Sequence, residues 1–168
     1  MHDIIERIGA QLDDKELTFT AKPIVIGGMA MEFYGMRKSG ADIDLVICDA
    51  DYQTLAAKHP DKRKDIWGDL GVVLEPFEIW RSINLLDYDF YGKEAIDQGR
   101  VQVVSLDRLL LMRVCAMGVQ KYMDDLKTMR NYYVGNFRNK DFAKDSEAHT
   151  SSYVKAGGTV WGGKYEDE

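Results

Sequence analysis

The chain has 168 residues, of which 45% are hydrophobic and 30% are charged, and its formal net charge at pH 7 is −6. This length suits one domain with a single core, and the acidic balance argues against a non-specific nucleic-acid binder, which needs basic residues. No apolar run reaches the roughly 20 residues of a membrane span, and the acidic start lacks the pattern of a signal peptide. We therefore expect a cytoplasmic protein in which Cys48 and Cys115 are reduced core residues.

The first half of the chain alternates between helix and strand patterns. Ile4, Ile8 and Leu12 recur at helical spacing and predict an amphipathic helix that ends near residues 13–15. The pattern then predicts a strand at 23–26, a helix at 29–35, a loop at 36–41, a strand at 42–47, a helix from about 49 to 59 and a charged surface connection at 61–65.

The second half contains more helix. Pro76 cannot donate a ladder hydrogen bond, so residues 72–80 form either an edge strand or two short strands with a turn at Glu75 and Pro76. The remaining expected elements are helical turns at 87–98, a strand at 101–104, a helix from 106 to about 117 and a last helix from 120 to about 133. This order favours an α/β domain over residues 1–142, with helices packed on one side of a sheet and a helical C-terminal part. A polar, glycine-rich tail is expected at 143–168.

Two motifs in the first half carry the chemistry. An apolar run ends in Gly27 and Gly28, and after thirteen further residues Asp42 and Asp44 enter an apolar strand. Residues two apart on a strand face the same side, and two adjacent carboxylates in apolar surroundings are costly unless a cation joins them. Glycines before a helix allow the backbone to approach a phosphate closely. The motifs predict a divalent-metal site beside a phosphate-binding turn. The alternatives are solvated carboxylates and a glycine turn needed for packing alone.

The order and spacing of these motifs resembles the signature of the polymerase-β-like nucleotidyltransferase superfamily, and is most similar to its small prokaryotic MNT-type and AbiEii-like branch. The resemblance covers about residues 1–130 and implies a nucleotidyltransferase-like mixed sheet. It also implies that Asp42 and Asp44 bind Mg²⁺ or Mn²⁺ together with a third acid from a neighbouring strand. Glu78 is the expected third acid because it lies inside an apolar strand, and Glu75 is the competitor. The alternative for Glu78 is an edge-strand acid that faces water.

The resemblance further implies a set of nucleotide-binding residues. Gly27 and Gly28 would approach a phosphate, and Arg37, in the loop before the aspartates, would contact the triphosphate. Lys38 and Ser39 are further phosphate candidates in the same loop. Plain surface charge is an equally good explanation for the two cations.

A second block, in the expected late helices, looks like a motif of AbiEii-type relatives that reads Ser-Leu-acid-x-Leu, then Lys, then Lys-Asp-x-x-Asp. It makes Arg113, Lys121 and Asp124 candidates for base, ribose or phosphate contacts. The chain departs from the motif, because Arg113 stands where a lysine is more usual and two residues separate Lys121 from Asp124. Ordinary charge pairs on a helix surface are the alternative.

These observations favour a metal-dependent nucleotidyltransferase that moves a nucleoside monophosphate from a nucleoside triphosphate (NTP) to an acceptor hydroxyl and releases pyrophosphate. A protein, a tRNA or a small molecule is the candidate acceptor, and a toxin or a second copy of the chain is a candidate partner, as in toxin–antitoxin or defence systems. The alternative is a catalytically silent nucleotidyltransferase-like binding protein that acts as an antitoxin or a complex subunit.

Overall fold

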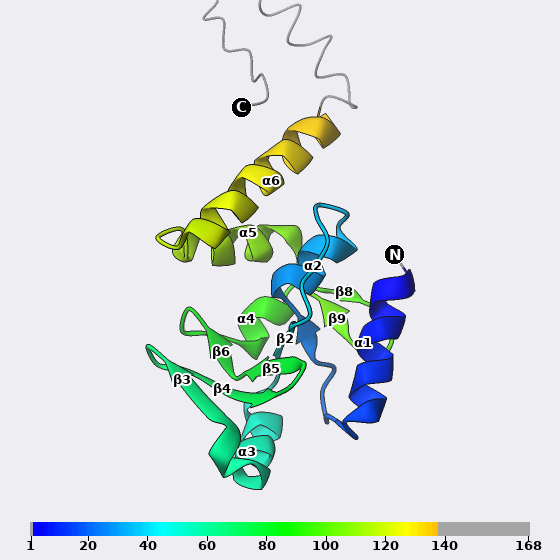
Figure 1. Ribbon diagram of the computed structural model, residues 1–168, viewed down its shortest axis with the longest axis vertical. Helices are drawn as coiled ribbons and strands as arrows, with labels where there is room; N and C mark the ends of the chain where they lie inside the picture. The colour runs from blue at the N-terminus through cyan, green and yellow to red at the C-terminus, as the bar shows by residue number, and fades with distance from the viewer. Residues whose placement is uncertain (1, 138–168) are drawn as a thin grey trace, which may run out of the picture. The chain divides into compact units, whose positions relative to one another are not determined.

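A computed structural model describes residues 2–137 of the chain as a mixed α/β structure (Figure 1). The helices are α1 (His2–Asp14), α2 (Gly27–Phe33), α3 (Asp49–Lys58), α4 (Tyr88–Gly92), α5 (Leu106–Cys115) and α6 (Gln120–Phe137), with a 3-10 turn at Pro60–Lys62. The strands are β1 (Ile24–Val25), β2 (Ile43–Val46), β3 (Arg63–Ile66), β4 (Asp69–Leu74), β5 (Phe77–Trp80), β6 (Ser82–Ile83), β7 (Leu86–Asp87), β8 (Ile96–Asp97) and β9 (Gln102–Val103).

Seven strands form one sheet in the order β3-β4-β5-β2-β1-β9-β8, and β6 and β7 form a separate two-stranded hairpin. The sheet is mixed: β2 is parallel to β5 and antiparallel to β1, while β1 is parallel to β9. The pairs β3–β4, β4–β5 and β8–β9 are antiparallel. The expected α/β class with a mixed sheet is therefore confirmed.

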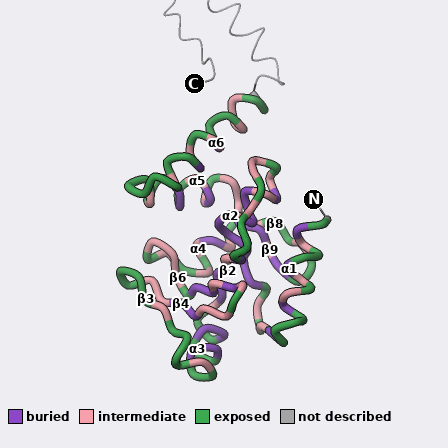
Figure 2. Tube along the Cα trace, in the orientation of Figure 1, coloured by how far each residue is buried: buried purple, intermediate pink, exposed green. Residues whose placement is uncertain are grey.

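Apolar spacing accounts for the core. In α1, Ile4, Ile8 and Leu12 lie on one helix face and are all buried, as their spacing predicts. Strand β2 is central in the sheet, and its Ile43 and Leu45 are almost fully buried. Figure 2 shows this buried layer continuing into α2. The core thus surrounds the two elements that carry the glycine and aspartate motifs.

Several boundaries differ from the prediction. Residues 63–66 are β3, a charged and mostly exposed edge strand that overlaps the surface connection expected at 61–65. Residues 72–80 take the second of the two expected arrangements, because β4 and β5 are antiparallel strands joined at Glu75 and Pro76. Cys115 is exposed rather than part of the core, whereas Cys48 is half-buried, and both thiols are unpaired.

The chain divides into two compact units, Met1–Thr128 and a second that begins at Met129, so α6 crosses the boundary. The site described below belongs to the first unit. The tail predicted at 143–168 lies outside the described residues. No helix among residues 2–137 is both long enough and apolar enough to span a membrane.

Candidate functional site

The two aspartates enter the sheet at the start of β2. Asp42 directly precedes the strand and is exposed, while Asp44 lies within it and is half-buried. The intervening Ile43 and the following Leu45 are buried. Because successive residues of a strand face opposite sides of the sheet, these apolar side chains lie on one face and the acidic ones on the other. Strand β5 runs parallel to β2 and places Glu78 directly opposite Asp44. The register therefore brings the predicted third acid beside the predicted metal ligand.

The competitor, Glu75, lies elsewhere. It is an exposed residue at the turn between β4 and β5, whereas Glu78 is half-buried within β5. The Glu78 carboxylate accepts a hydrogen bond from the Lys64 ammonium of β3, with 3.0 Å between Nζ and Oε1. Of the two candidate acids, the structure thus places Glu78 beside Asp44.

Asp44 lies in an electrostatically unfavourable place for a carboxylate. Burial is the largest effect, and the neighbouring Glu78 adds to it, so the pKa of Asp44 is raised from its ordinary value of 3.8 to about 6. Arg113 and Lys121 act in the opposite direction, and Asp42 raises the pKa a little further. Two acids and two cations, most of them far from Asp44 in the sequence, therefore act on this one carboxyl group.

The glycine turn packs directly against this carboxylate. Gly27 has a φ of +63°, which L-residues rarely adopt, and a Cβ at this position would overlap the Asp44 carboxylate. Gly28 is less constrained: its φ is not positive, and a Cβ there would lie 3.6 Å from Arg37 Nη1 and 3.7 Å from the Ser39 Cβ, in ordinary contact. The close approach that the sequence predicts for a phosphate is thus made, in this structure, by Asp44 at Gly27.

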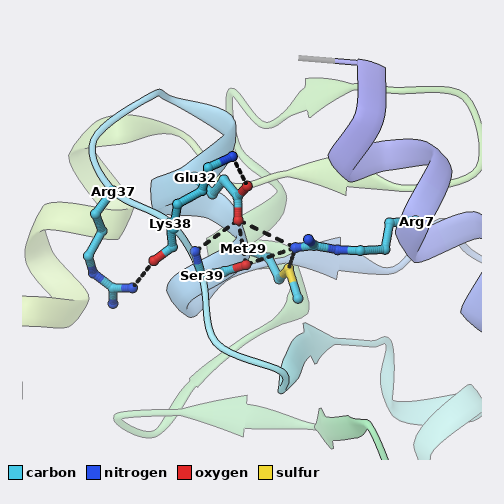
Figure 3. A network of polar contacts seen from close by, with 6 residues as sticks. All are labelled: Arg7, Met29, Glu32, Arg37, Lys38 and Ser39. Carbon is cyan, nitrogen blue, oxygen red and sulfur yellow. Dashed lines mark hydrogen bonds and ion pairs between the residues drawn. The ribbon is translucent and has the colours of Figure 1, made fainter.

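The loop between α2 and β2 is held by a network around Glu32 (Figure 3). The Glu32 carboxylate accepts hydrogen bonds from the backbone and hydroxyl of Ser39 and from Lys38 Nζ, and Arg7 Nη2 donates to the Ser39 hydroxyl at 2.8 Å. The Ser39 hydrogen bonds are the main reason that the pKa of Glu32 is lowered to about 2. Lys38 and Ser39 therefore have a structural role in shaping the loop, whatever else they contact.

A buried cluster of charges anchors the other side of this loop. Arg37 donates two hydrogen bonds to Asp125 of α6, from Nε at 2.7 Å and from Nη2 at 3.1 Å. Arg113 of α5 forms an ion pair with the same carboxylate, at 3.0 Å from its Nε, in a geometry that is not aligned for a hydrogen bond. The Arg113 guanidinium also lies 4.9 Å from the centre of the Tyr122 ring. Asp125 thus joins the loop, α5 and α6.

Sequence reasoning named Asp124 and missed Asp125. Asp124 is exposed and accepts a hydrogen bond from Gln120 on its own helix, as the surface-charge alternative predicts, whereas Asp125 is 3% exposed. The signal was the spacing: Asp125 comes three residues after Tyr122 and four before Met129, which marks the face of the helix that carries apolar residues. A charge on that face needs a partner.

A cavity of about 270 Å³ opens beside these residues. Its lining includes Gly27, Asp44, Lys64, Glu78, Arg113 and Tyr122. Lys121 is exposed, and its Nζ lies 6.0 Å from the centre of the Tyr122 ring. Its positive charge acts to lower the pKa of Asp44. Four of the predicted site residues, Gly27, Asp44, Glu78 and Arg113, therefore line one cavity. The described contacts of Arg37, Lys38, Ser39 and Asp124 are structural.

The acids fit a hard divalent cation in chemistry, because carboxylate oxygens are the ligands that Mg²⁺ prefers. Burial and the neighbouring Glu78 raise the pKa of Asp44, and a bound cation would offset both effects. Within residues 2–137, however, no three side chains of His, Cys, Asp or Glu gather closely enough to hold a metal ion. Glu78 is instead paired with Lys64. Asp42 and Asp44 are accordingly the pair that would hold a cation, with Glu78 free to join them only after its ion pair with Lys64 opens.

Comparisons with protein-family models, with curated proteins and with solved structures found no match to this chain.

Proposed function

We propose that this protein is a metal-dependent nucleotidyltransferase that moves a nucleoside monophosphate from an NTP to an acceptor hydroxyl. The observation that carries the proposal is the position of Asp44. Its carboxylate packs on the Gly27 turn, Glu78 lies opposite it in the sheet, and Asp42 comes two residues before it. Clustered acids beside a glycine turn suit a site that holds a cation and a polyphosphate. The mixed sheet is compatible with a nucleotidyltransferase-like fold, which the sequence signature implies.

Each residue has a role in this proposal. Asp42 and Asp44 would hold Mg²⁺ or Mn²⁺, which supplies charge neutralisation for the phosphates. Arg113 lines the cavity, its ion pair with Asp125 fixes its position, and from there it would contact the triphosphate. Glu78 would accept the proton of the acceptor hydroxyl as its oxygen attacks the α-phosphorus and pyrophosphate leaves. Lys64, paired with Glu78, would move to the departing phosphates.

The second candidate is a silent nucleotidyltransferase-like binding protein. The observation in its favour is the ion pair between Lys64 and Glu78, which gives Glu78 a partner without any metal. A protein of this kind would bind a partner and would not turn over an NTP. The two proposals differ in their need for the acids, because only catalysis requires a metal to join Asp42 and Asp44.

Calorimetry with Mn²⁺ and each of the four NTPs tests the first proposal. We expect the wild-type chain to bind at least one metal–NTP complex and the double variant Asp42→Asn/Asp44→Asn to bind it at least about tenfold more weakly, which is about 1.4 kcal/mol. Equal binding by the double variant would contradict the proposal. An exposed pair of acids, Asp13→Asn/Asp14→Asn at the end of α1, is the control.

Glu75 and Glu78 offer a matched pair for the transfer step. With saturating NTP, Glu78→Gln should lower the single-turnover rate by about 10²-fold or more, the usual size of a general-base effect, while Glu75→Gln should leave it within about twofold. Equal and mild effects of the two substitutions would favour the silent binding protein.

A further inference from the structure

Trp67 occupies an unusual place for a tryptophan. It is the first of two residues that join β3 to β4, and its side chain is 92% exposed. Its φ is +51°, and that of the next residue, Gly68, is +91°. Hairpin turns with two positive φ values favour asparagine, aspartate or glycine at the first position, and a bulky ring there is disfavoured. Neither burial nor turn geometry therefore explains this side chain.

The turn that carries Trp67 is firmly held. Asp65 Oδ1 accepts a hydrogen bond from the Gly68 amide at 3.0 Å. At the foot of the turn, the Asp69 carboxylate accepts hydrogen bonds from the backbone amides of Asn84 at 2.7 Å and of Leu85 at 2.8 Å, in the turn between β6 and β7. The two hairpin tips are thereby tied together. Trp67 is presented on a preorganised platform, which lowers the entropic cost of binding a ligand.

Trp67 also lines the cavity that contains the proposed catalytic acids. Because its side chain is so exposed, it must line the open side of that cavity. Asp44 and Glu78 line the same cavity, as do two further aromatic residues, Trp80 and Tyr122. One cavity therefore combines the acidic end that suits a metal and phosphates with aromatic rings that suit a flat, apolar group.

We propose that the indole of Trp67 stacks on the nucleobase of the bound NTP. The proposal rests on the proposed function, because it assigns the aromatic side of that site. The cavity volume of about 270 Å³ suits part of a single nucleotide better than a folded partner. Stacking needs only the π-face of a base, so Trp67 supplies affinity for every base and little choice among them.

The test compares ligands with and without a base. Calorimetry measures the binding of ATP and of inorganic tripolyphosphate, each with Mn²⁺, and of adenosine without metal, to the full chain. Trp67→Ala should weaken ATP and adenosine by about tenfold or more and leave tripolyphosphate unchanged, whereas Trp67→Phe should weaken ATP by only about threefold. Leu85→Ala is the matched control, because Leu85 is a second exposed apolar residue on the adjacent tip, at 71% exposure.

Three results would overturn the proposal. ATP binding could be the same in Trp67→Ala and wild type, Trp67→Ala could weaken tripolyphosphate as much as ATP, or Leu85→Ala could match Trp67→Ala. Wild-type protein that binds neither ATP nor adenosine would overturn it as well, together with the proposed function. If instead Trp67→Ala loses ATP and adenosine while Asp42→Asn/Asp44→Asn keeps ATP, the stacking role stands and the metal-dependent function fails.

Discussion

At the scale of single residues, Asp44 combines three properties that a purely structural carboxylate would lack. It is half-buried, it lies opposite a second acid in the strand register, and it packs on a glycine with no room for a side chain. The burial and the neighbouring acid make the ionised form less stable in the fold than in water. Asp44 thus occupies a place that costs stability, which is common where a cation or a substrate is bound.

The Asp44→Asn substitution should therefore stabilise the metal-free protein at neutral pH. The pKa of Asp44 in the fold, about 6, exceeds the ordinary value of 3.8, so the fold favours the protonated carboxyl group. The free energy of unfolding that wild type owes to this preference is complete below about pH 4 and is lost as the pH rises through 6. The free energy of unfolding of Asp44→Asn should therefore exceed that of wild type by an amount that grows over this interval to on the order of 2–3 kcal/mol. Urea unfolding in the presence of EDTA at pH 4, 5, 6 and 7.5 measures it.

Asp61→Asn provides the control for this measurement, since Asp61 is an exposed acid whose carboxylate lies 3.7 Å from Lys62. It should change the free energy of unfolding by less than about 0.5 kcal/mol at every pH. A pH-independent difference between Asp44→Asn and wild type would contradict the assigned pKa.

Sequence patterns singled out the acids of the candidate site but not the way its cations are held. Asp42 and Asp44 stand out because acids are rare in apolar strands, and Glu78 stands out for the same reason. The pairing of Arg37 with Asp125 joins residues 88 positions apart. Such a pair depends on how α6 packs, which local spacing does not determine.

At the scale of elements, the turn between β1 and α2 is the most constrained connection near the site. Only one residue, Ile26, separates the buried strand from a helix of seven residues, and Gly27 takes the positive φ that this change of direction needs. The double glycine was predicted as one unit, yet its two members differ. Only Gly27 is closed in by Asp44.

Substitution of each glycine by alanine should therefore have different effects on stability. Gly27→Ala places a Cβ at a positive φ and against the Asp44 carboxylate, and should destabilise the protein by about 2 kcal/mol or more. Gly28→Ala meets only ordinary contacts and improves helix propensity, so it should be neutral or stabilising by up to about 1 kcal/mol. Thermal and urea unfolding of both variants measure the difference, and a larger loss in Gly28→Ala would refute this account of the turn.

Strand β3 shows why some elements escape prediction. Residues 63–66 carry two basic side chains and an acid, and their sequence lacks the apolar alternation of a buried strand. They form a strand because β4 supplies hydrogen bonds along one side, while charges on an outer strand oppose pairing with another molecule. By contrast, α1 and β2 were predicted closely because their burial follows the sequence period.

At the scale of the whole molecule, Asp125 links separate elements of the first compact unit. Its carboxylate links the loop before β2 and α5 to the part of α6 that belongs to the same unit. Both Asp125 and Arg113 are at most 5% exposed, so neither charge can turn to water if the other is removed. Burial lowers the pKa of Arg113, and the Asp125 charge opposes that change.

Asp125→Ala should consequently destabilise the protein by about 3–5 kcal/mol, because it leaves a buried guanidinium without its main counter-charge. The adjacent Asp124→Ala removes an exposed acid and should cost less than about 0.5 kcal/mol. Urea unfolding at pH 7 compares the two variants. Similar losses for both would mean that Asp125 is no more important than a surface charge.

The sheet order has a consequence for synthesis of the chain. Strand β1 leaves the ribosome early, but its parallel partner β9, which pairs Val25 with Val103, follows only after β2 to β8 have been made. During this interval one edge of an apolar strand has no partner and is exposed to association with other nascent chains. A pause in translation before Val103 would therefore lengthen the time during which this edge is open to aggregation.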